Sequence, residues 1–168
     1  RVRESLFNIL AHAPWAQQVA GLLTSGDALV LDAFAGSGAL GFEALSRGAE
    51  RAWFWDRSAA CITTIRDNAR HLNAGDRVIA QRIDATKPPT APRPVDLVFL
   101  DPPYEQGFIP TTLDALTRHG WVRDLTLVVA ETKRREQLVL NTDWISLDRR
   151  DIGDTGLSFL RPSMAGAA

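Results

Sequence analysis

The fold of this chain is decided by the stretch Leu31-Asp32-Ala33-Phe34-Ala35-Gly36-Ser37-Gly38-Ala39-Leu40-Gly41. It continues a short apolar run that begins at residue 28, which is typical of a strand buried on both faces of a sheet. The glycines predict a tight turn over 33–38. A helix is then expected to run to Arg47, with Gly48 just beyond its end, where a left-handed residue is common. A buried strand, a glycine turn and a helix indicate the first unit of an α/β fold.

The rest of the chain continues this alternation. Apolar runs predict strands at 52–55, 78–80, 95–100 and 125–130, and helical periodicity predicts helices at 3–23, 58–72 and 109–119, the first broken or kinked at Pro14. The runs 144–149 and 156–160, separated by a glycine turn, predict a hairpin. We therefore expect one domain over 1–168. Its fold would be α/β, with a mostly parallel seven-stranded sheet, helices on both faces and an antiparallel C-terminal hairpin.

The composition limits the classes of protein to consider. The 168 residues are 45% hydrophobic and carry a net charge of −1, and no apolar run approaches the ~20 residues of a membrane span. The charged opening is no secretory signal, and the single Cys61 excludes a disulfide framework, so we expect a cytoplasmic protein that binds no membrane. We also expect a monomer. The three histidines have no ligand partners at suitable spacing, so no metal site is expected. Because the chain starts without Met inside an expected helix, we expect a leading segment to be missing.

The glycine motif permits two interpretations. Gly36, Gly38 and Gly41 form a G-x-G-x-x-G, and Asp56 lies 20 residues after Gly36, which is the pattern of a nicotinamide- or flavin-binding oxidoreductase. Asp32 argues against that interpretation, because a pyrophosphate binds the bare amides of a helix N-terminus and is repelled by a carboxylate beside them. S-adenosyl-L-methionine carries no phosphate but has an ammonium and a sulfonium group. We therefore predict it as the methyl donor, with S-adenosyl-L-homocysteine as its product.

Acids at three successive strand ends predict how this cofactor is held. Asp32 would bind the ammonium group, and Asp56 would accept both ribose hydroxyls, although Asp56 could instead be a helix cap or turn residue. Asp84 could bind the adenine amino group or, equally, close a turn. The predicted cofactor-binding residues are Asp32, Phe34, Ala35, Gly36, Ser37, Gly38, Gly41, Asp56, Arg57, Asp84 and Ala85.

The tetrapeptide Asp101-Pro102-Pro103-Tyr104 directly follows the fourth predicted strand. Two prolines make the loop rigid. Hydrogen bonds from the two N–H groups of a base's amino group to the Asp101 carboxylate and the Pro102 carbonyl would orient this poor nucleophile. Tyr104 would stack on the flipped base. These four residues therefore predict a catalytic loop that methylates an exocyclic amine. A strand ending in a proline turn capped by Asp101 is the simpler alternative.

Longer segments resemble one family. They are the opening from Arg1 to Leu10, the glycine stretch with the following residues 43–49, and Asp101 to Tyr104. They strongly resemble the RsmD-like family of class I, Rossmann-like methyltransferases. The resemblance implies methylation of guanine N2 in 16S ribosomal RNA of the small ribosomal subunit. Three features depart from the family: the absence of an extra N-terminal segment, Asp56 in place of the usual Glu, and 151–156 in place of a Tyr-Gly-x-Thr turn.

Arginines are the expected RNA contacts, because their planar forks suit phosphates and stack on bases, although each could be a solvated surface residue. The predicted nucleic-acid-binding residues are Arg1, Arg3, Arg134, Arg135, Arg149 and Arg150. Three alternatives stay open: a DNA base methyltransferase acting on adenine N6 or cytosine, a NAD-binding oxidoreductase, and a non-catalytic RNA-binding module. Carbon-5 methylation of cytosine is disfavoured, because it needs a thiolate and Cys61 lies inside a predicted helix.

Overall fold

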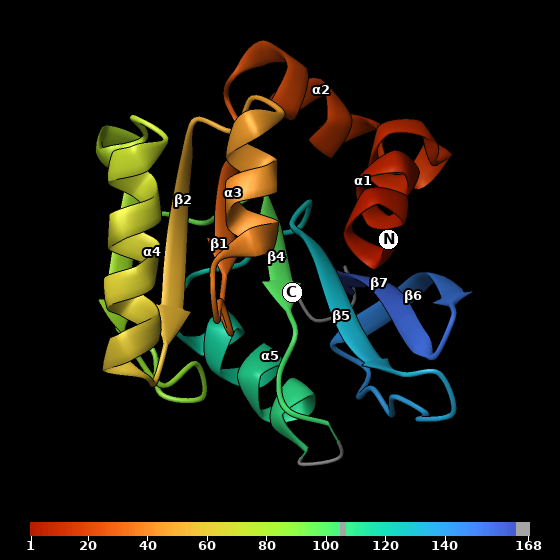
Figure 1. Ribbon diagram of the computed structural model, residues 1–168. Coiled ribbons are helices and arrows are strands. Elements are labelled where there is room, and N and C mark those ends of the chain that lie inside the picture. Colours follow the sequence, from red (N-terminus) through yellow and green to blue (C-terminus); the bar gives the residue numbers. More distant parts are fainter. Residues whose placement is uncertain (105–106, 164–168) are drawn as a thin grey trace.

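The structure is a computed structural model that describes residues 1–104 and 107–163. Its centre is a seven-stranded sheet with the order β3-β2-β1-β4-β5-β7-β6 (Figure 1). The strands are β1 (Leu29–Asp32), β2 (Arg51–Asp56), β3 (Val78–Arg82), β4 (Leu97–Leu100), β5 (Leu127–Lys133), β6 (Trp144–Ile152) and β7 (Thr155–Pro162). The first five strands pair in parallel, and β7 pairs antiparallel to both of its neighbours. The predicted mixed sheet is therefore confirmed.

The strand order places a switch point between β1 and β4. From β1 the chain first builds β2 and β3 on one side, and then returns to build β4 and β5 on the other. In open α/β sheets a ligand crevice forms beyond the carboxyl ends of strands at such a point. The glycine loop follows β1, and the loop that starts at Asp101 follows β4. Both motifs therefore lie where this topology forms a binding site.

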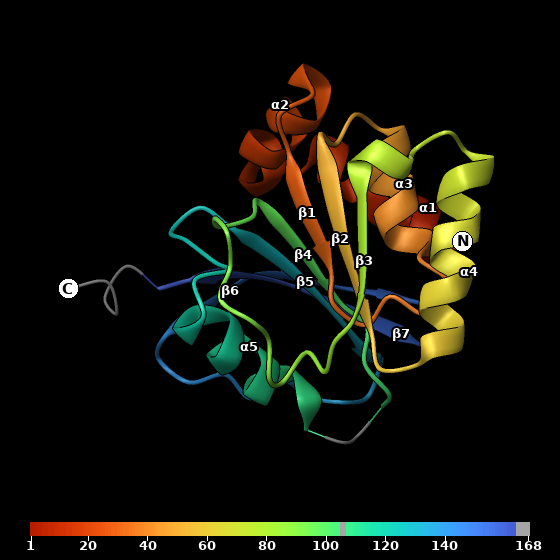
Figure 2. The same cartoon turned by 90° about the vertical axis from the view of Figure 1, so that its left-hand side faces the viewer.

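Helices cover both faces of the sheet (Figure 2). They are α1 (Val2–His12), α2 (Gln17–Ser25), α3 (Ala39–Ser46), α4 (Ala59–His71) and α5 (Phe108–Arg118). Side chains of α1 to α4 share one apolar cluster with one face of the strands, and α5 packs in a second cluster on the opposite face. In the described part of the chain, every helix is too short or too polar to cross a membrane.

The predicted N-terminal helix is interrupted at Pro14, as expected. Helix α1 ends at His12, a 3₁₀ turn spans Pro14–Ala16, and α2 starts at Gln17. Proline lacks the N–H that would continue the helical hydrogen bonds, and its ring clashes with the preceding turn. The two shorter helices meet at an angle and both contribute to the apolar cluster on their face of the sheet.

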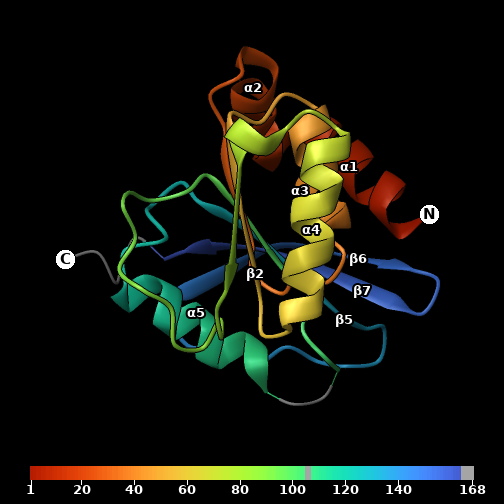
Figure 3. The same ribbon diagram turned by 60° about the vertical axis from the view of Figure 1, so that its left-hand side comes forward.

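The C-terminal hairpin adopts a position that the sequence left open. Strand β7 lies between β5 and β6, so the antiparallel strand is internal and β6 forms the edge (Figure 3). Residues 156–160 of β7 are all buried, whereas most residues of β6 are exposed or half-buried. The more apolar strand therefore takes the internal position, because burial of apolar surface stabilises it there.

Asp96 is an acid that precedes the apolar strand β4, and it has a structural role. Its Oδ2 accepts a hydrogen bond from the backbone N–H of Leu29 at 2.8 Å. Its Oδ1 lies 2.8 Å from a guanidinium nitrogen of Arg123. The carboxylate thus ties the start of β1 to the segment between α5 and β5. A buried carboxylate with two such partners is satisfied, and it lies apart from the carboxyl ends of the strands.

Candidate active site

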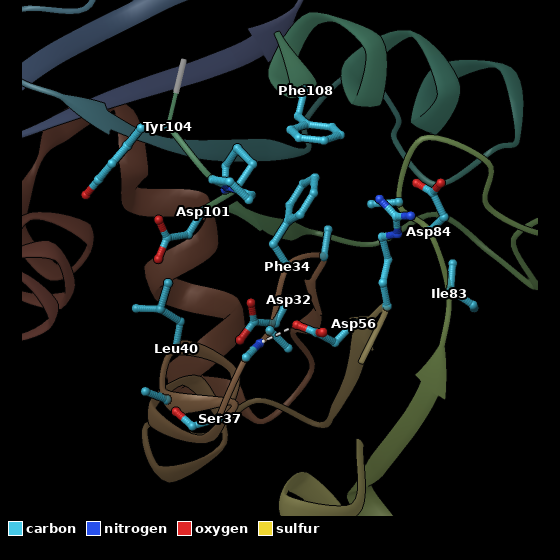
Figure 4. Close-up of a pocket in the computed structure, with 18 residues that line it drawn as sticks. Asp32, Phe34, Ser37, Leu40, Asp56, Ile83, Asp84, Asp101, Tyr104 and Phe108 are labelled. Carbon is cyan, nitrogen blue, oxygen red and sulfur yellow. Dashed lines mark hydrogen bonds between the residues drawn. The ribbon is translucent and has the colours of Figure 1, made fainter. Parts of the chain in front are cut away.

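A cavity of about 620 Å³ lies beyond the carboxyl ends of β1, β2 and β4 (Figure 4). Residues from four consecutive strand ends of the parallel sheet form its wall. They are Asp32, Ala33, Phe34, Ala35, Gly36, Ser37, Ala39, Leu40, Asp56, Arg57, Ile83, Asp84, Ala85, Asp101, Pro102, Pro103, Tyr104 and Phe108. The structure therefore brings the predicted catalytic loop and most of the predicted cofactor-binding residues to one cavity.

Asp32 lies at the base of this cavity and is buried. Its Oδ2 accepts a hydrogen bond from the backbone N–H of Gly41 at 3.0 Å, in the first turn of α3. The pKa of Asp32 is raised to about 7, mainly by burial and also by the negative charges of Asp101 and Asp56, while the hydrogen bond from Gly41 acts to lower it. A cationic group bound beside Asp32 would favour its ionised form.

We expect Asp32→Asn to stabilise the fold at neutral and higher pH. The pKa of Asp32 is about 7 in the folded chain against 3.8 for an ordinary aspartate, so the folded state binds this proton more tightly than the unfolded state. Asp32 therefore costs stability increasingly as the pH rises from 3.8 to about 7, with each pKa unit equivalent to about 1.4 kcal/mol. Asparagine keeps an oxygen acceptor for the Gly41 N–H and removes the charge.

Urea unfolding at several pH values measures this effect. The free energy of unfolding of Asp32→Asn should exceed that of the wild type at pH 8 in the absence of ligand, and the difference should shrink toward pH 4. Equal stabilities at pH 8 would show that the buried carboxylate carries no such penalty.

The three glycines of the motif serve different purposes. Gly36 has a positive φ of 55°, and its N–H donates to Asp56 Oδ2 at 2.9 Å. Gly38 and Gly41 do not line the cavity, and their contact with the cofactor stays a prediction. A Cβ at Gly41 would run into the ring of Phe54 on β2, and a Cβ at Gly38 would run into the ring of Phe42 on α3. The last two glycines therefore let α3 pack closely on the sheet.

Asp56 and Asp84 both close turns while they face the cavity. Asp56 Oδ1 accepts from the N–H of Ser58, and Asp84 Oδ1 accepts from both the N–H and the hydroxyl of Thr86. The hydrogen bond from the Thr86 hydroxyl is the main cause that lowers the pKa of Asp84, which keeps it ionised. The predicted turn roles are thus present, and the carboxylates retain free lone pairs toward the cavity.

The loop from Asp101 to Tyr104 separates this cavity from a second one of about 200 Å³. Asp101 and Tyr104 are exposed and Pro102 is buried. Surrounding protein atoms desolvate the Asp101 carboxyl and raise its pKa. Desolvation also raises the pKa of Tyr104, helped by the negative charges of Glu131 and Asp101. The loop therefore presents a carboxylate and a neutral phenol ring between the two cavities.

Several wall residues were not predicted. Phe108, the first residue of α5, stands beside Phe34 with ring centroids 6.1 Å apart (Figure 4). Glu131 on β5 and Glu136 after it line the second cavity. Glu131 carried a recognisable signal, because it follows the predicted strand 125–130 as an acid at a strand end, like Asp32 and Asp101. Phe108 had no such signal, since an apolar residue at a helix start is ordinary.

The predicted RNA-binding arginines fall into two groups. Arg134 and Arg135, with Lys133, line a third cavity of about 720 Å³ that also includes Tyr104. Arg134 also pairs with Asp151 at 3.7 Å and donates to the carbonyl oxygen of Gly153 at 3.3 Å. The other four predicted arginines lie outside this cavity and contact protein groups. Arg1 lies beside Gly153, Arg3 pairs with Glu43, Arg150 pairs with Asp148, and Arg149 pairs with Asp151.

Arg149 has a further structural role. Its side chain crosses β7 at Gly156, where a Cβ would overlap with the guanidinium. It donates to the carbonyl oxygens of Arg134 at 2.8 Å and Glu136 at 3.3 Å. Arg149 therefore holds the segment after β5, which borders both the second and the third cavity.

The sequence matches one protein family over nearly its whole described length. The model of the family described as conserved hypothetical protein 95 matches residues 1–161. A relative from Haemophilus influenzae, named ribosomal RNA small subunit methyltransferase D, is 32% identical over 157 residues, which is 91% of this chain and 76% of the relative. The Escherichia coli protein of the same name is 35% identical over 133 residues, or 79% of this chain and 62% of the relative.

Solved structures agree with this match. The Escherichia coli protein yhhF superposes with a TM-score of 0.79 at 30% identity, covering 97% of this chain and 86% of that one. An RNA methyltransferase from Salinibacter ruber, solved with S-adenosyl-L-homocysteine, has a TM-score of 0.64 at 16% identity and covers 90% of this chain and 93% of that one, which shows the shared Rossmann-like fold. With a family match from residue 1 to 161 and an identity of 32% to a relative covered over 76% of its length, the chain belongs to the RsmD-like methyltransferase family.

Proposed function

We propose that this chain catalyses S-adenosyl-L-methionine-dependent methylation of the exocyclic N2 amino group of a guanine in 16S ribosomal RNA of the small subunit. One observation carries the proposal: the Asp101–Tyr104 loop opens onto the same cavity as Asp32 and Asp56. An amine held by this loop would face a methyl donor that is bound by the acids at the other strand ends. The names of the relatives, which are ribosomal RNA small subunit methyltransferases, support the acceptor.

The cavity suits a cationic methyl donor. The charges that act on the buried Asp32 carboxyl, those of Asp101 and Asp56, are both negative, so a cation beside it would be stabilised. We assign Asp32 to the ammonium group, Asp56 to the ribose, and Asp84 with Ala85 to the adenine. Phe34, Ala35, Gly36, Ser37 and Arg57 complete this part of the wall. When bound, S-adenosyl-L-methionine supplies a methyl group that is activated by its sulfonium.

The catalytic loop would act on the amine mainly by alignment. The Asp101 carboxylate and the Pro102 carbonyl accept the two N–H groups, which directs the nitrogen lone pair toward the donor. Tyr104 stacks on the base, a contact worth about 1–3 kcal/mol. Asp101 can also take the proton that the nitrogen loses after methylation, because its raised pKa makes it a better base than an ordinary aspartate.

The third cavity offers a path for the RNA backbone. Lys133, Arg134 and Arg135 line it together with Asp151 and Asp154. The Lys133 ammonium lies 5.5 Å from the centroid of the Tyr104 ring. Basic side chains next to the base-stacking residue would bind phosphates that flank a flipped nucleotide. Arg1 lies near this region beside Gly153. Arg3, Arg149 and Arg150 would contribute less, because they do not line this cavity.

Transfer of a labelled methyl group tests the proposal. Purified protein is incubated with the labelled donor and, separately, with small ribosomal subunits that lack the modification, their deproteinised 16S RNA, or duplex DNA. We expect label in the RNA of at least one of the first two samples. Mass spectrometry of the digested RNA should then identify N2-methylguanosine at one nucleotide.

Two results would contradict the proposal. Label confined to DNA would indicate a DNA amino-methyltransferase, which can use the same kind of loop. Calorimetric binding of NAD without binding of S-adenosyl-L-homocysteine would indicate a dinucleotide-binding protein.

A further inference from the structure

Glu131 lies beside the catalytic loop. Leu100 of β4 and Ala130 of β5 are register partners in parallel strands, so the next residues, Asp101 and Glu131, are neighbours just beyond the end of β4, while β5 continues to Lys133. Their carboxyl groups lie within hydrogen-bonding contact. The loop thus has a second carboxyl group next to the one that holds the amine.

Glu131 also lines the second cavity, on the far side of the catalytic loop from the cavity that contains Asp32. The second cavity, of about 200 Å³, is lined on one side by Pro102, Pro103 and Tyr104 and on the other by Glu131 and Glu136. Oε1 of Glu136 is buried and has no hydrogen-bond partner among the described residues. This cavity therefore combines a rigid aromatic and proline wall with acceptor groups.

The edges of the bases differ in the atom beside the amino group. In guanine the amino group is next to N1–H, so this edge presents two neighbouring hydrogen-bond donors. In adenine and cytosine the corresponding ring nitrogens, N1 and N3, are acceptors. An ionised carboxylate only accepts hydrogen bonds. A carboxylate beside Asp101 therefore attracts the guanine edge and repels the lone pairs of the other two bases.

In the free site Glu131 favours its protonated form, because burial, the negative charge of Asp101 and the hydrogen bond with it together raise the pKa of Glu131 to about 7. When Glu131 accepts a hydrogen bond from a base, its proton must leave to solvent. A donor that approaches Glu131 stabilises its carboxylate form and offsets the repulsion from Asp101. Guanine N1–H is such a donor.

We infer that Glu131 accepts a hydrogen bond from N1–H of the target guanine while Asp101 holds its amino group. The two neighbouring carboxylates then select guanine over adenine and cytosine. The inference rests on the proposed function and identifies the residue that determines its base specificity.

A base analogue tests the inference. After the target nucleotide has been mapped, 16S RNA is assembled with either guanine or 2-aminopurine at that position. 2-Aminopurine keeps the amino group but has an acceptor at N1. We expect the wild type to prefer guanine by about 10- to 100-fold in kcat/KM, the effect of one hydrogen bond to a charged group.

Substitution at Glu131 should remove this preference. The Glu131→Gln side chain can donate to N1 of 2-aminopurine, so the preference should fall to within about threefold, while binding of S-adenosyl-L-homocysteine stays unchanged. Glu136→Gln is the matched control, because it alters a carboxylate of the same cavity that is not a neighbour of Asp101. A merely structural role of Glu131 would lower both rates together and leave their ratio unchanged.

The outcomes separate the inference from the proposed function. If the wild type methylates both bases equally well, or if Glu131→Gln keeps the full preference, the role of Glu131 is wrong although the proposed function stands. If only Glu136→Gln abolishes the preference, the specificity residue is Glu136. If the wild type methylates no guanine of 16S RNA, the proposed function and the inference both fail.

Discussion

Asp101→Ala is expected to lower methyl transfer by at least about a hundredfold, the usual effect of removing one group that orients or stabilises the reacting centre. Asp101 is the acid of the loop, and its side chain is exposed to the cavity shared with Asp32 (Figure 4). Without its carboxylate, one N–H of the amine has no acceptor, and the nitrogen lone pair is no longer directed toward the donor. Single-turnover rates with the RNA substrate measure the effect.

Cofactor binding separates this role from a loss of folding. Calorimetry with S-adenosyl-L-homocysteine should give a dissociation constant within about threefold of the wild type, because this product lacks the sulfonium charge that Asp101 would attract. Asp124→Ala is a suitable control, since Asp124 is exposed and lies outside the three cavities described above. Wild-type turnover by Asp101→Ala would refute the assigned role of the loop.

Gly48→Ala is expected to lower the free energy of unfolding by about 2–5 kcal/mol. Gly48 has a φ of 114°, which costs an L-residue about 1–2 kcal/mol. A Cβ there would also overlap with the backbone carbonyl oxygen of Leu23 in α2. Because neither backbone can move without displacing its helix, this overpacking adds about 1–3 kcal/mol. Chemical denaturation measures the change.

Gly26→Ala is the matched control for this prediction. Gly26 also has a positive φ, 79°, but the nearest atom to an added Cβ is 3.9 Å away. This variant isolates the backbone cost of about 1–2 kcal/mol. Equal losses for the two variants would mean that the contact with Leu23 relaxes freely. A loss at Gly48 below about 1 kcal/mol would contradict the close approach of the two segments.

Much of the fold and of the candidate site was predictable from local patterns. Buried parallel strands are continuous apolar runs, so β1, β2 and β4 were recognisable within a few residues. Asp32, Asp56 and Asp101 each follow such a run, and carboxyl ends of parallel strands meet at one edge. The sequence therefore predicted that these acids gather at one cavity, and the structure confirms it.

Other predictions concerned residues whose surroundings come from distant parts of the chain. Gly38 and Gly41 fit a cofactor motif, and the structure adds that the rings of Phe42 and Phe54 pack closely against them. Arg149 is a predicted RNA contact that also has structural partners: the missing side chain of Gly156 lets it cross β7 to carbonyl oxygens of the segment after β5. No local pattern contains Phe54 or these carbonyl oxygens as partners.

By itself, the sequence determined the alternation of strands and helices, the rigid Asp-Pro-Pro-Tyr loop and the acids at the strand ends, because these depend on neighbouring residues and on spacing. Only the tertiary structure decided that β7 lies between β5 and β6 in the sheet, that Asp96 joins Leu29 to Arg123, and that Glu131 lies beside Asp101. Strand order and register bring together residues far apart in the chain. The energy of such contacts depends on burial and distance, which a linear pattern does not contain.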